Sequence, residues 1–495
     1  MMRSILAMTV LAGCAAPRPH GSAHFALEEG SCAALCVTRI VATLVQDGKE
    51  HTAEAPCGGT ARFDDLTPGS EVVVTASLVA ADGAVRLTGS SSPVLVTAGQ
   101  DVPVTVTLHP TEAPVIAGLY PPVLAPPGAE AQGLYVGGTG FGAGAGASRV
   151  LLGEEELSRI GWGDDAATVS VAPGSVSGDV TVVACGVPAE PVPLRILAAS
   201  PSQSWLSLPV CPGGASPSVR ALASAIEGVY VAVACPVGGY ATRMRPDDCT
   251  FKGGTTALEG EPVAAAAADA LLWVVSRGPA RLSTAVGGTE QVVAELTSDP
   301  TGVAAAPGGL VWLVVGGRLQ QLGAEGPYAV PGIDSGLDVR AVVTVGTSLI
   351  ATARGATTGR VLFIDSTTQG VTERVLQQCA DPKALGSDGY RAYIACGSVV
   401  DVLDYATLAE VPIGVPGDIA ALAVDWEASL VFAAHATGVS AVVPELGAPV
   451  TWSELGPVTR AATWGLSPGS ALVIGAGGSV LRLGTLTGGP PCGGG

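Results

Sequence analysis

The C-terminal three hundred residues repeat one apolar strand pattern. Short apolar runs recur with a bulky side chain at the centre, and the centres are Tyr230, Trp273, Trp312, Ile350, Tyr393, Phe432 and Val473. These centres are 43, 39, 38, 43, 39 and 41 residues apart. A period near forty, with a glycine-containing turn before each run, is the spacing of a four-stranded propeller blade. The pattern predicts a seven-bladed β-propeller over residues 200–495, in which residues 204–210 supply the outer strand of the last blade.

Residues 26–110 alternate apolar and polar positions with a period of two. Turn pairs such as Asp47-Gly48, Pro68-Gly69 and Asp82-Gly83 separate the alternating runs. Strands separated by such turns every dozen or so residues are typical of a β-sandwich. The run from Phe63 to Gly69, followed by a valine-rich strand, resembles the small prealbumin-like or fibronectin-like sandwiches of exported bacterial proteins. We expect a spacer in this region.

Residues 114–197 carry an ordered set of short motifs. These are Gly138-Thr139-Gly140-Phe141-Gly142, Val169-Ser170-Val171-Ala172-Pro173 and Ser177-Gly178-Asp179-Val180. The set is similar to that of IPT/TIG immunoglobulin-like domains, and the resemblance implies a second sandwich. The repeats after residue 200 resemble YVTN-type propeller repeats, with strand-ending acids at Asp365 and Asp404. The expected fold class is all-β, with two N-terminal β-sandwich domains followed by a seven-bladed β-propeller.

The first residues have the features of an export signal. A cationic start at Arg3 precedes a short apolar segment, and Leu11-Ala12-Gly13-Cys14 follows it. This resembles a bacterial lipoprotein signal peptide over residues 1–13. The resemblance implies lipidation of Cys14, a lipidated linker over residues 14–25 and, from Ala15, placement in the outer membrane. An ordinary secretory peptide with an incidental cysteine is the alternative.

The charge balance excludes one class of partner. The chain has 43 acidic and 24 basic side chains and a net charge of −19. An acidic surface repels phosphate backbones, so we expect no nucleic-acid partner. Only 14% of the residues are charged, which leaves ample apolar material for buried cores. The expected partners are the membrane, through the N-terminal lipid, and a protein or a small anionic or glycan ligand.

Ten cysteines remain after Cys14, and an even number in an exported chain favours disulfides. Cys211 and Cys235 flank one connection between strands, and Cys379 and Cys396 flank the matching connection in another repeat. We predict these two pairs. The pairing of the other six is open, and these are Cys32, Cys36, Cys57, Cys185, Cys249 and Cys492.

Candidates for chemistry are few. His435 is the one histidine after residue 200, and no nucleophile elbow, zincin motif or P-loop occurs. The clusters Glu154-Glu155-Glu156 and Asp164-Asp165 have the composition of solvated loops. We therefore expect no catalytic residue, no metal site and no cofactor.

Four cations occupy comparable positions in the repeats. Arg220, Arg340 and Lys383 stand ten residues before the central residue, and Arg460 shares their sequence context. The comparable positions of the second, third and sixth repeats are assigned to Val263, Val303 and Ile419. Equivalent positions in a ring converge on its axis, so these cations are candidates for an anion site at one channel mouth. Local pairing with Asp338, Asp381 and neighbouring acids is the alternative.

Two functions follow from these patterns. The favoured one is a non-catalytic lipoprotein that displays a binding or scaffolding head from the cell envelope. The alternative is a propeller hydrolase or lyase that acts on sugars or lactones through carboxylates and the cations of the channel mouth.

Overall fold

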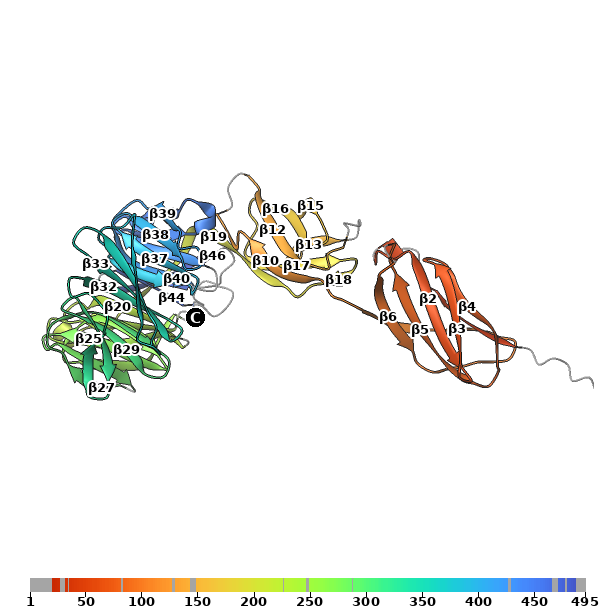
Figure 1. Cartoon of the computed structure of the whole chain (residues 1–495), viewed down its shortest axis with the longest axis horizontal. Coiled ribbons are helices and arrows are strands. Elements are labelled where there is room, and N and C mark those ends of the chain that lie inside the picture. Colours follow the sequence, from red (N-terminus) through yellow and green to blue (C-terminus); the bar gives the residue numbers. More distant parts are fainter. Residues whose placement is uncertain are drawn as a thin grey trace, which may run out of the picture. The chain divides into compact units, whose positions relative to one another are not determined.

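The computed structural model describes residues 20–486 apart from 27–31, 34, 82, 127–129, 143–147, 226, 246–248, 287, 426–428, 465–470 and 477–478. The expected signal peptide, Cys14 and Cys492 lie outside the described residues. The chain is all-β (Figure 1). The 3-10 helices η1 (Pro212–Gly214), η2 (Pro444–Leu446) and η3 (Ser453–Leu455) are single turns. In the described part, no helix is long and apolar enough to cross a membrane.

The chain divides into two compact units. Unit 1 comprises Met1–Leu119, Tyr135–Ser170 and Asp179–Val192, and unit 2 comprises Tyr120–Leu134, Val171–Gly178 and Pro193–Gly495. Parts of the segment 114–197, which the sequence presents as one sandwich, therefore belong to unit 2.

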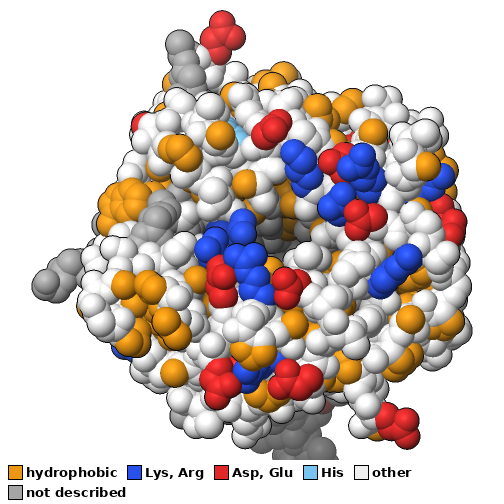
Figure 2. Space-filling view, turned by 90° about the vertical axis from the view of Figure 1, so that its left-hand side faces the viewer, with side chains coloured by type: hydrophobic (Ala, Val, Ile, Leu, Met, Phe, Trp, Pro, Cys, Tyr) orange, Lys and Arg blue, Asp and Glu red, His pale blue; other side chains and the backbone are white. Residues whose placement is uncertain are grey.

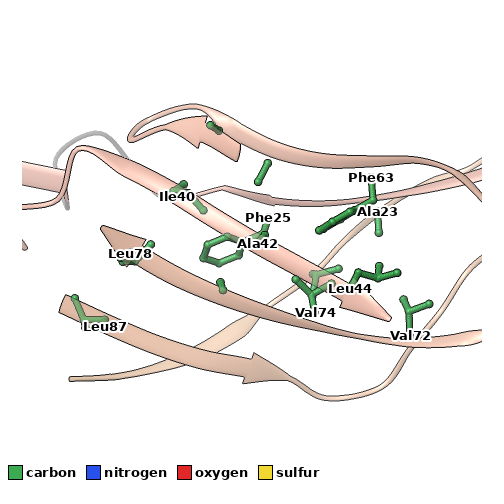
Figure 3. Packing of buried hydrophobic residues seen from close by; sticks show 14 of the residues in the cluster. Ala23, Phe25, Ile40, Ala42, Leu44, Phe63, Val72, Val74, Leu78 and Leu87 are labelled. Carbon is green, nitrogen blue, oxygen red and sulfur yellow. The ribbon is translucent and has the colours of Figure 1, made fainter. Parts of the chain in front are cut away.

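The first half of unit 1 consists of two small sheets. Their strands are β1 (Gly21–Ala26), β2 (Arg39–Gln46), β3 (Lys49–Pro56), β4 (Thr60–Leu66), β5 (Glu71–Val79), β6 (Val85–Ser91), β7 (Val94–Leu95), β8 (Asp101–Pro103) and β9 (Val106–Pro110). The strand orders are β4-β1-β8 and β3-β2-β5-β6-β9, with β7 beside β5. Alternate side chains of both sheets, among them Phe25, Ile40 and Phe63, point inward and form one core (Figure 3).

Strand β1 corrects the expected linker. Residues 21–25 were expected in the lipidated linker, but they form most of β1, which pairs with β4 and runs parallel to β8. Ala23 and Phe25 are buried there. The segment is short, and Gly21, Ser22 and His24 stand around its apolar positions, so its alternation is too brief to stand out in the sequence.

The second half of unit 1 contains further short strands. They are β10 (Val115–Tyr120), β12 (Gln132–Thr139), β13 (Arg149–Leu152), β14 (Glu155–Glu156), β15 (Ser158–Trp162), β16 (Ala166–Val171), β17 (Gly178–Ala184) and β18 (Val187–Pro188). One sheet has the order β10-β12-β16-β15, and β17 pairs with β13 and β18. Phe141 packs on Trp162, whose indole N–H donates to the Gly142 carbonyl oxygen at 2.9 Å.

Two disulfides stabilise unit 1. Cys32 is bonded to Cys57, and Cys36 is bonded to Cys185, which is 149 residues further along the chain. The second bond links the segment 26–110 covalently to the segment 114–197. Neither pairing could be deduced from cysteine spacing alone.

Unit 2 contains a series of four-stranded antiparallel sheets in chain order. The first three are β20 (Ser218–Ala225), β21 (Gly228–Ala234), β22 (Gly239–Arg245), β23 (Thr250–Leu258); β24 (Glu261–Ala268), β25 (Leu271–Arg277), β26 (Arg281–Val286), β27 (Thr289–Glu295); and β28 (Pro300–Ala306), β29 (Leu310–Val315), β30 (Arg318–Gly323), β31 (Gly326–Ala329). The next three are β32 (Asp338–Val345), β33 (Ser348–Arg354), β34 (Gly359–Ile364), β35 (Val371–Val375); β36 (Ala384–Ser387), β37 (Arg391–Cys396), β38 (Val399–Asp404), β39 (Glu410–Gly414); and β40 (Ile419–Asp425), β41 (Leu430–His435), β42 (Gly438–Val442), β43 (Val450–Trp452).

The seventh sheet is built from both ends of unit 2. It contains β44 (Arg460–Trp464), β45 (Ala471–Ala476), β46 (Ser479–Leu486) and the second half of β19 (Val192–Ser207), while β11 (Val123–Leu124) pairs with the first half of β19. Residues 202–207 of β19 pair antiparallel with residues 479–484 of β46. The prediction that an early segment supplies the outer strand is confirmed, although this strand starts earlier than residue 204 and ends at Ser207.

The sheets form a closed ring. The first strands β20, β24, β28, β32, β36, β40 and β44 lie side by side in this order, and β44 also lies beside β20. Each core lies between neighbouring sheets. Trp312 of the third sheet, for example, packs with Leu349 and Ala351 of the fourth. A single sheet buries too little apolar surface by itself, so each sheet depends on its neighbours. The series is consistent with the blades of a β-propeller.

Candidate anion site at one mouth of the ring

The first strands of the ring share a β-bulge near their beginning. The pairing register of five of them shifts by one residue, and the residues at the shift are Arg220, Val263, Thr301, Arg340 and Ala420. A bulge turns one side chain away from the regular alternation and is often found next to a functional site. The shift corrects two assignments, because Thr301 and Ala420 take the places that the sequence pattern gave to Val303 and Ile419.

The four predicted cations lie at the same end of the first strands. Arg220 and Arg340 are bulge residues, Lys383 precedes β36 with its N–H bonded to the Ala395 carbonyl oxygen at 2.9 Å, and Arg460 begins β44. On the face shown in Figure 2, basic side chains gather around a central hollow with acidic side chains between them. The end of the ring that carries these four cations is called the cationic mouth below.

Arg340 and Lys383 are balanced by carboxylates. Arg340 lies 2.8 Å from Asp338 and 4.0 Å from Asp381, and Lys383 lies 3.8 Å from Asp418. These groups line a pocket of about 300 Å³, except for Asp418. The structure therefore shows local pairing, the alternative that the sequence left open, for these two cations.

The acids of the mouth follow a rule that the sequence analysis missed. Two residues before each bulge or its equivalent, the second to sixth sheets carry Glu261, Asp299, Asp338, Asp381 and Asp418. A cation of one sheet meets the acid of the next: Arg220 lies 2.8 Å from Glu261, as Arg340 approaches Asp381 and Lys383 approaches Asp418. The signal in the sequence is a second series with a period near forty, offset from the cations by two residues.

Arg460 has no such acid. Its next sheet around the ring is the first, and the corresponding position there is Ser218. The guanidinium group instead donates to the main-chain oxygens of Arg220 and of Thr459, the latter at 2.7 Å. Within the described part of the chain, no carboxylate pairs with Arg460. Burial lowers the pKa of Arg460, and the positive charge of Arg220 lowers it further.

Arg220 is only partly neutralised. Glu261, its partner, also accepts a hydrogen bond from Arg277 at 2.9 Å, and this bond is the main reason that the pKa of Glu261 lies below its ordinary value. One carboxylate thus serves two cations, while Arg460 next to them has none. An anion placed here would relieve the repulsion between Arg220 and Arg460.

Two disulfides hold the loops of the mouth. Cys211 is bonded to Cys235 and Cys379 to Cys396, the two pairs that the sequence predicts. The loops that they close contain Arg220 and Lys383, respectively. Loops with sequence separations of 24 and 17 residues are stabilised by about 3 kcal/mol each in the chain-entropy model. The mouth is therefore held in shape before a ligand binds.

The strongest acid-base candidates lie away from solvent. His435 is fully buried, and its ring nitrogens contact the hydroxyls of Ser440 at 2.8 Å and Thr437 at 2.9 Å. Burial lowers the pKa of His435. Asp401 is also fully buried, and burial together with the charge of Glu410 raises its pKa to about 7. No substrate can reach either group in this conformation.

The acidic side chains of the chain do not form a metal centre where the structure describes them. Among the described residues, no group of three His, Cys, Asp or Glu side chains could hold a metal ion. The exposed pair Glu155 and Glu156 forms the short strand β14. Asp365 and Asp404 accept hydrogen bonds from the N–H groups two and three residues further on, at distances of 2.7 to 3.1 Å. These strand-ending acids stabilise turns.

Comparisons with known proteins were made on sequence and structure. No family model and no curated protein matches the chain. Among solved structures, the β-propeller domain of Cps50 (Swd1) from Myceliophteria thermophila is 11% identical, with a TM-score of 0.46, over 57% of this chain and 99% of that one. An auxiliary nutrient binding protein from Bacteroides thetaiotaomicron is 10% identical, with a TM-score of 0.37, over 76% and 98%.

Proposed function

We propose that the chain is a lipid-anchored, non-catalytic envelope protein that binds an anionic ligand at the cationic mouth. In this proposal the ring is a seven-bladed YVTN-type β-propeller, carried on a prealbumin- or fibronectin-like sandwich and an IPT/TIG domain. Cys14 carries the lipid. The ligand is a small anion, an anionic glycan or an acidic surface of a partner protein.

The observation that carries the proposal is the uncompensated Arg460. Arg220, Arg340 and Lys383 each have a carboxylate from the next sheet, whereas the position next to Arg460 holds Ser218. The chain has a net charge of −19, so acidic residues are abundant, yet position 218 carries serine instead of an acid. A partly buried guanidinium beside a second cation favours an anionic ligand group, because the low-dielectric surroundings strengthen the attraction.

The disulfides support an extracytoplasmic location. Four bonds are present among the described residues, in both units. Disulfides form and persist in oxidising compartments and are rare in the cytosol. Together with the lipoprotein-like N-terminus, this supports display of the ring from the cell envelope, with the outer membrane as the proposed site.

The test supplies the missing acid without removing a cation. Ser218→Glu places a carboxylate opposite Arg460, as Glu261 lies opposite Arg220. Calorimetric titration with inorganic phosphate and with glucuronate is expected to show about tenfold weaker binding for this variant, since one charge-assisted contact contributes about 1.5–3 kcal/mol before solvent screening. Arg460→Gln is expected to give a similar loss.

Ser216→Glu is the matched control, because it adds the same charge two residues earlier at an exposed position. Its affinity for both anions should stay within about twofold of the wild type, as surface charge alone has a small effect. Equal affinities for Ser216→Glu and Ser218→Glu, or no binding of either anion by the wild type, would refute the proposed anion site.

A further inference from the structure

A chamber lies inside the ring beyond the cationic mouth. It has a volume of about 890 Å³ and is lined by all seven first strands. One aliphatic side chain from each strand contributes to the wall: Leu222, Ala267, Ala305, Val343, Leu385, Leu422 and Ala462. Most of these side chains are only half-buried. Pockets for small molecules have volumes of roughly 300–1,000 Å³ and mostly apolar walls.

The chamber wall begins one residue after Arg460 and two residues after Arg220 along their strands. Ala461, the residue after Arg460, lines the chamber, and so does Leu222, two residues after Arg220. With a rise of about 3.3 Å per residue, the apolar wall starts roughly 3–7 Å along the strands from these guanidinium-bearing residues. A molecule with its head at Arg460 can therefore place an apolar tail in the chamber.

The acids at the far end of the chamber are already engaged. Glu227 pairs with Arg243, and Asp269 accepts a hydrogen bond from the Gly308 N–H at 2.6 Å. Asp425 lies 2.6 Å from Arg195, and both side chains are buried. These partners reduce the repulsion that the three carboxylates would exert on an anion. Near the start of the apolar wall, Arg460 is a cation that no carboxylate pairs with among the described residues.

We propose that the ligand is an aliphatic monocarboxylate, with its carboxylate at Arg460 and Arg220 and its alkyl chain along the chamber. This inference rests on the proposed anion site and adds the substrate class. One unbalanced guanidinium matches a single negative charge. Half-exposed aliphatic side chains gain when an alkyl chain displaces water from them, and the gain grows with each methylene buried.

The first experiment varies chain length in the wild-type full-length chain. Acetate, hexanoate, octanoate and decanoate are titrated by calorimetry below the concentrations at which they aggregate. About 0.8 kcal/mol per fully buried methylene corresponds to an upper limit of about fourfold in affinity. We expect the affinity to rise about two- to fourfold per added methylene from hexanoate to decanoate. Equal affinities along the series would overturn the inference.

The variants test the head and the wall separately. Ser218→Glu is expected to weaken octanoate binding about tenfold and to leave binding of neutral octanol unchanged. Val343→Gln, in the chamber wall, is expected to flatten the chain-length dependence. Val292→Gln makes the same change on the exposed outer strand β27 and should not alter it. Because the wild-type series needs no variant, a misfolded Val343→Gln protein leaves the test intact.

The outcomes separate this inference from the proposed function. If acetate and decanoate bind equally and both depend on Ser218, the anion site stands and the apolar tail is wrong. If octanol binds as tightly as octanoate and Ser218→Glu has no effect, both are wrong. An octyl phosphate arm identifies the head group, because tighter binding of the phosphate than of octanoate would overturn the carboxylate assignment.

Discussion

Asp401 is a buried acid that should make the protein less stable as the pH rises from 4 to 7. It lies on β38, is fully buried, and neither carboxyl oxygen has a hydrogen-bond partner among the described residues. Glu410 begins the adjacent strand β39, where it accepts hydrogen bonds from the N–H groups of Gln377 at 2.9 Å and Gln378 at 3.2 Å. Burial and this neighbouring charge raise the pKa of Asp401 to about 7. We predict that Asp401→Asn stabilises the protein above pH 7.

The sign follows from proton uptake. Between about pH 4 and pH 7 the native state keeps a proton on Asp401 that the unfolded state releases, so the free energy of unfolding falls as the pH rises. The interval from an ordinary pKa near 4 to about 7 corresponds to an upper limit of about 4 kcal/mol, at about 1.4 kcal/mol per pH unit. Asparagine carries no charge at any pH. We expect about 1–3 kcal/mol of stabilisation at pH 8 and almost none at pH 4.5.

Calorimetric unfolding at a series of pH values from 4.5 to 8 measures this difference. Asp404→Asn is the control on the same hairpin, because hydrogen bonds from the backbone N–H groups of Thr407 and Ala406 lower the pKa of that half-buried acid. This control should lose stability at pH 8. If Asp401→Asn loses stability by the same amount at every pH, the carboxyl group is not a buried, raised acid and the reasoning fails.

Two further predictions concern the ring. The pKa of His435 is lowered by burial, so its contribution to stability is present above its ordinary pKa near 6.5 and is lost as the pH falls below that value. His435→Gln should therefore reduce the loss of stability between pH 7 and pH 5, an effect opposite in sign to that of Asp401. If calorimetry shows the same loss of stability between pH 7 and pH 5 in the variant and the wild type, the prediction is wrong. Replacing Cys211 and Cys235 together by alanine should lower the free energy of unfolding by about 3 kcal/mol and weaken anion binding at Arg220 and Arg460. Removing the Cys32–Cys57 bond of unit 1 should leave anion affinity unchanged. Equal affinities for the two variants would show that the mouth does not depend on its disulfide.

The repeat pattern predicted the ring sheets because burial acts locally in every repeat. Trp312, Tyr393 and Phe432, for example, each lie near the middle of the second strand of a sheet, where both faces of the strand are covered. Such a strand must be apolar along its whole length, so its signal is strong. The disulfides Cys211–Cys235 and Cys379–Cys396 were predictable for a related reason, since both bridge the same local connection.

Contacts between distant segments were not predictable in this way. Cys36 and Cys185 are 149 residues apart, and Arg195 pairs with Asp425 across 230 residues. Nothing in the sequence near one partner constrains the other. The indole of Trp452 likewise donates to the Ala198 carbonyl oxygen at 3.0 Å, a contact that exists only because β19 returns to close the ring.

The candidate site depends both on the local repeat pattern and on contacts between distant segments. The cations at 220, 340, 383 and 460 were visible from their position in the repeat, but whether a carboxylate neutralises each of them depends on the next sheet. Asp381 was among the pairing alternatives, but a β-bulge adds one residue without changing the apolar pattern, so that pattern alone did not place Glu261 and Asp418 opposite the cations that they neutralise. When the sheets are aligned by their bulges, the positions equivalent to Ser218 in the second to sixth sheets all carry an acidic residue. In a ring the first sheet is also the neighbour of the last, so Ser218 leaves Arg460 without a carboxylate from the next sheet, and the proposed anion site rests on this difference.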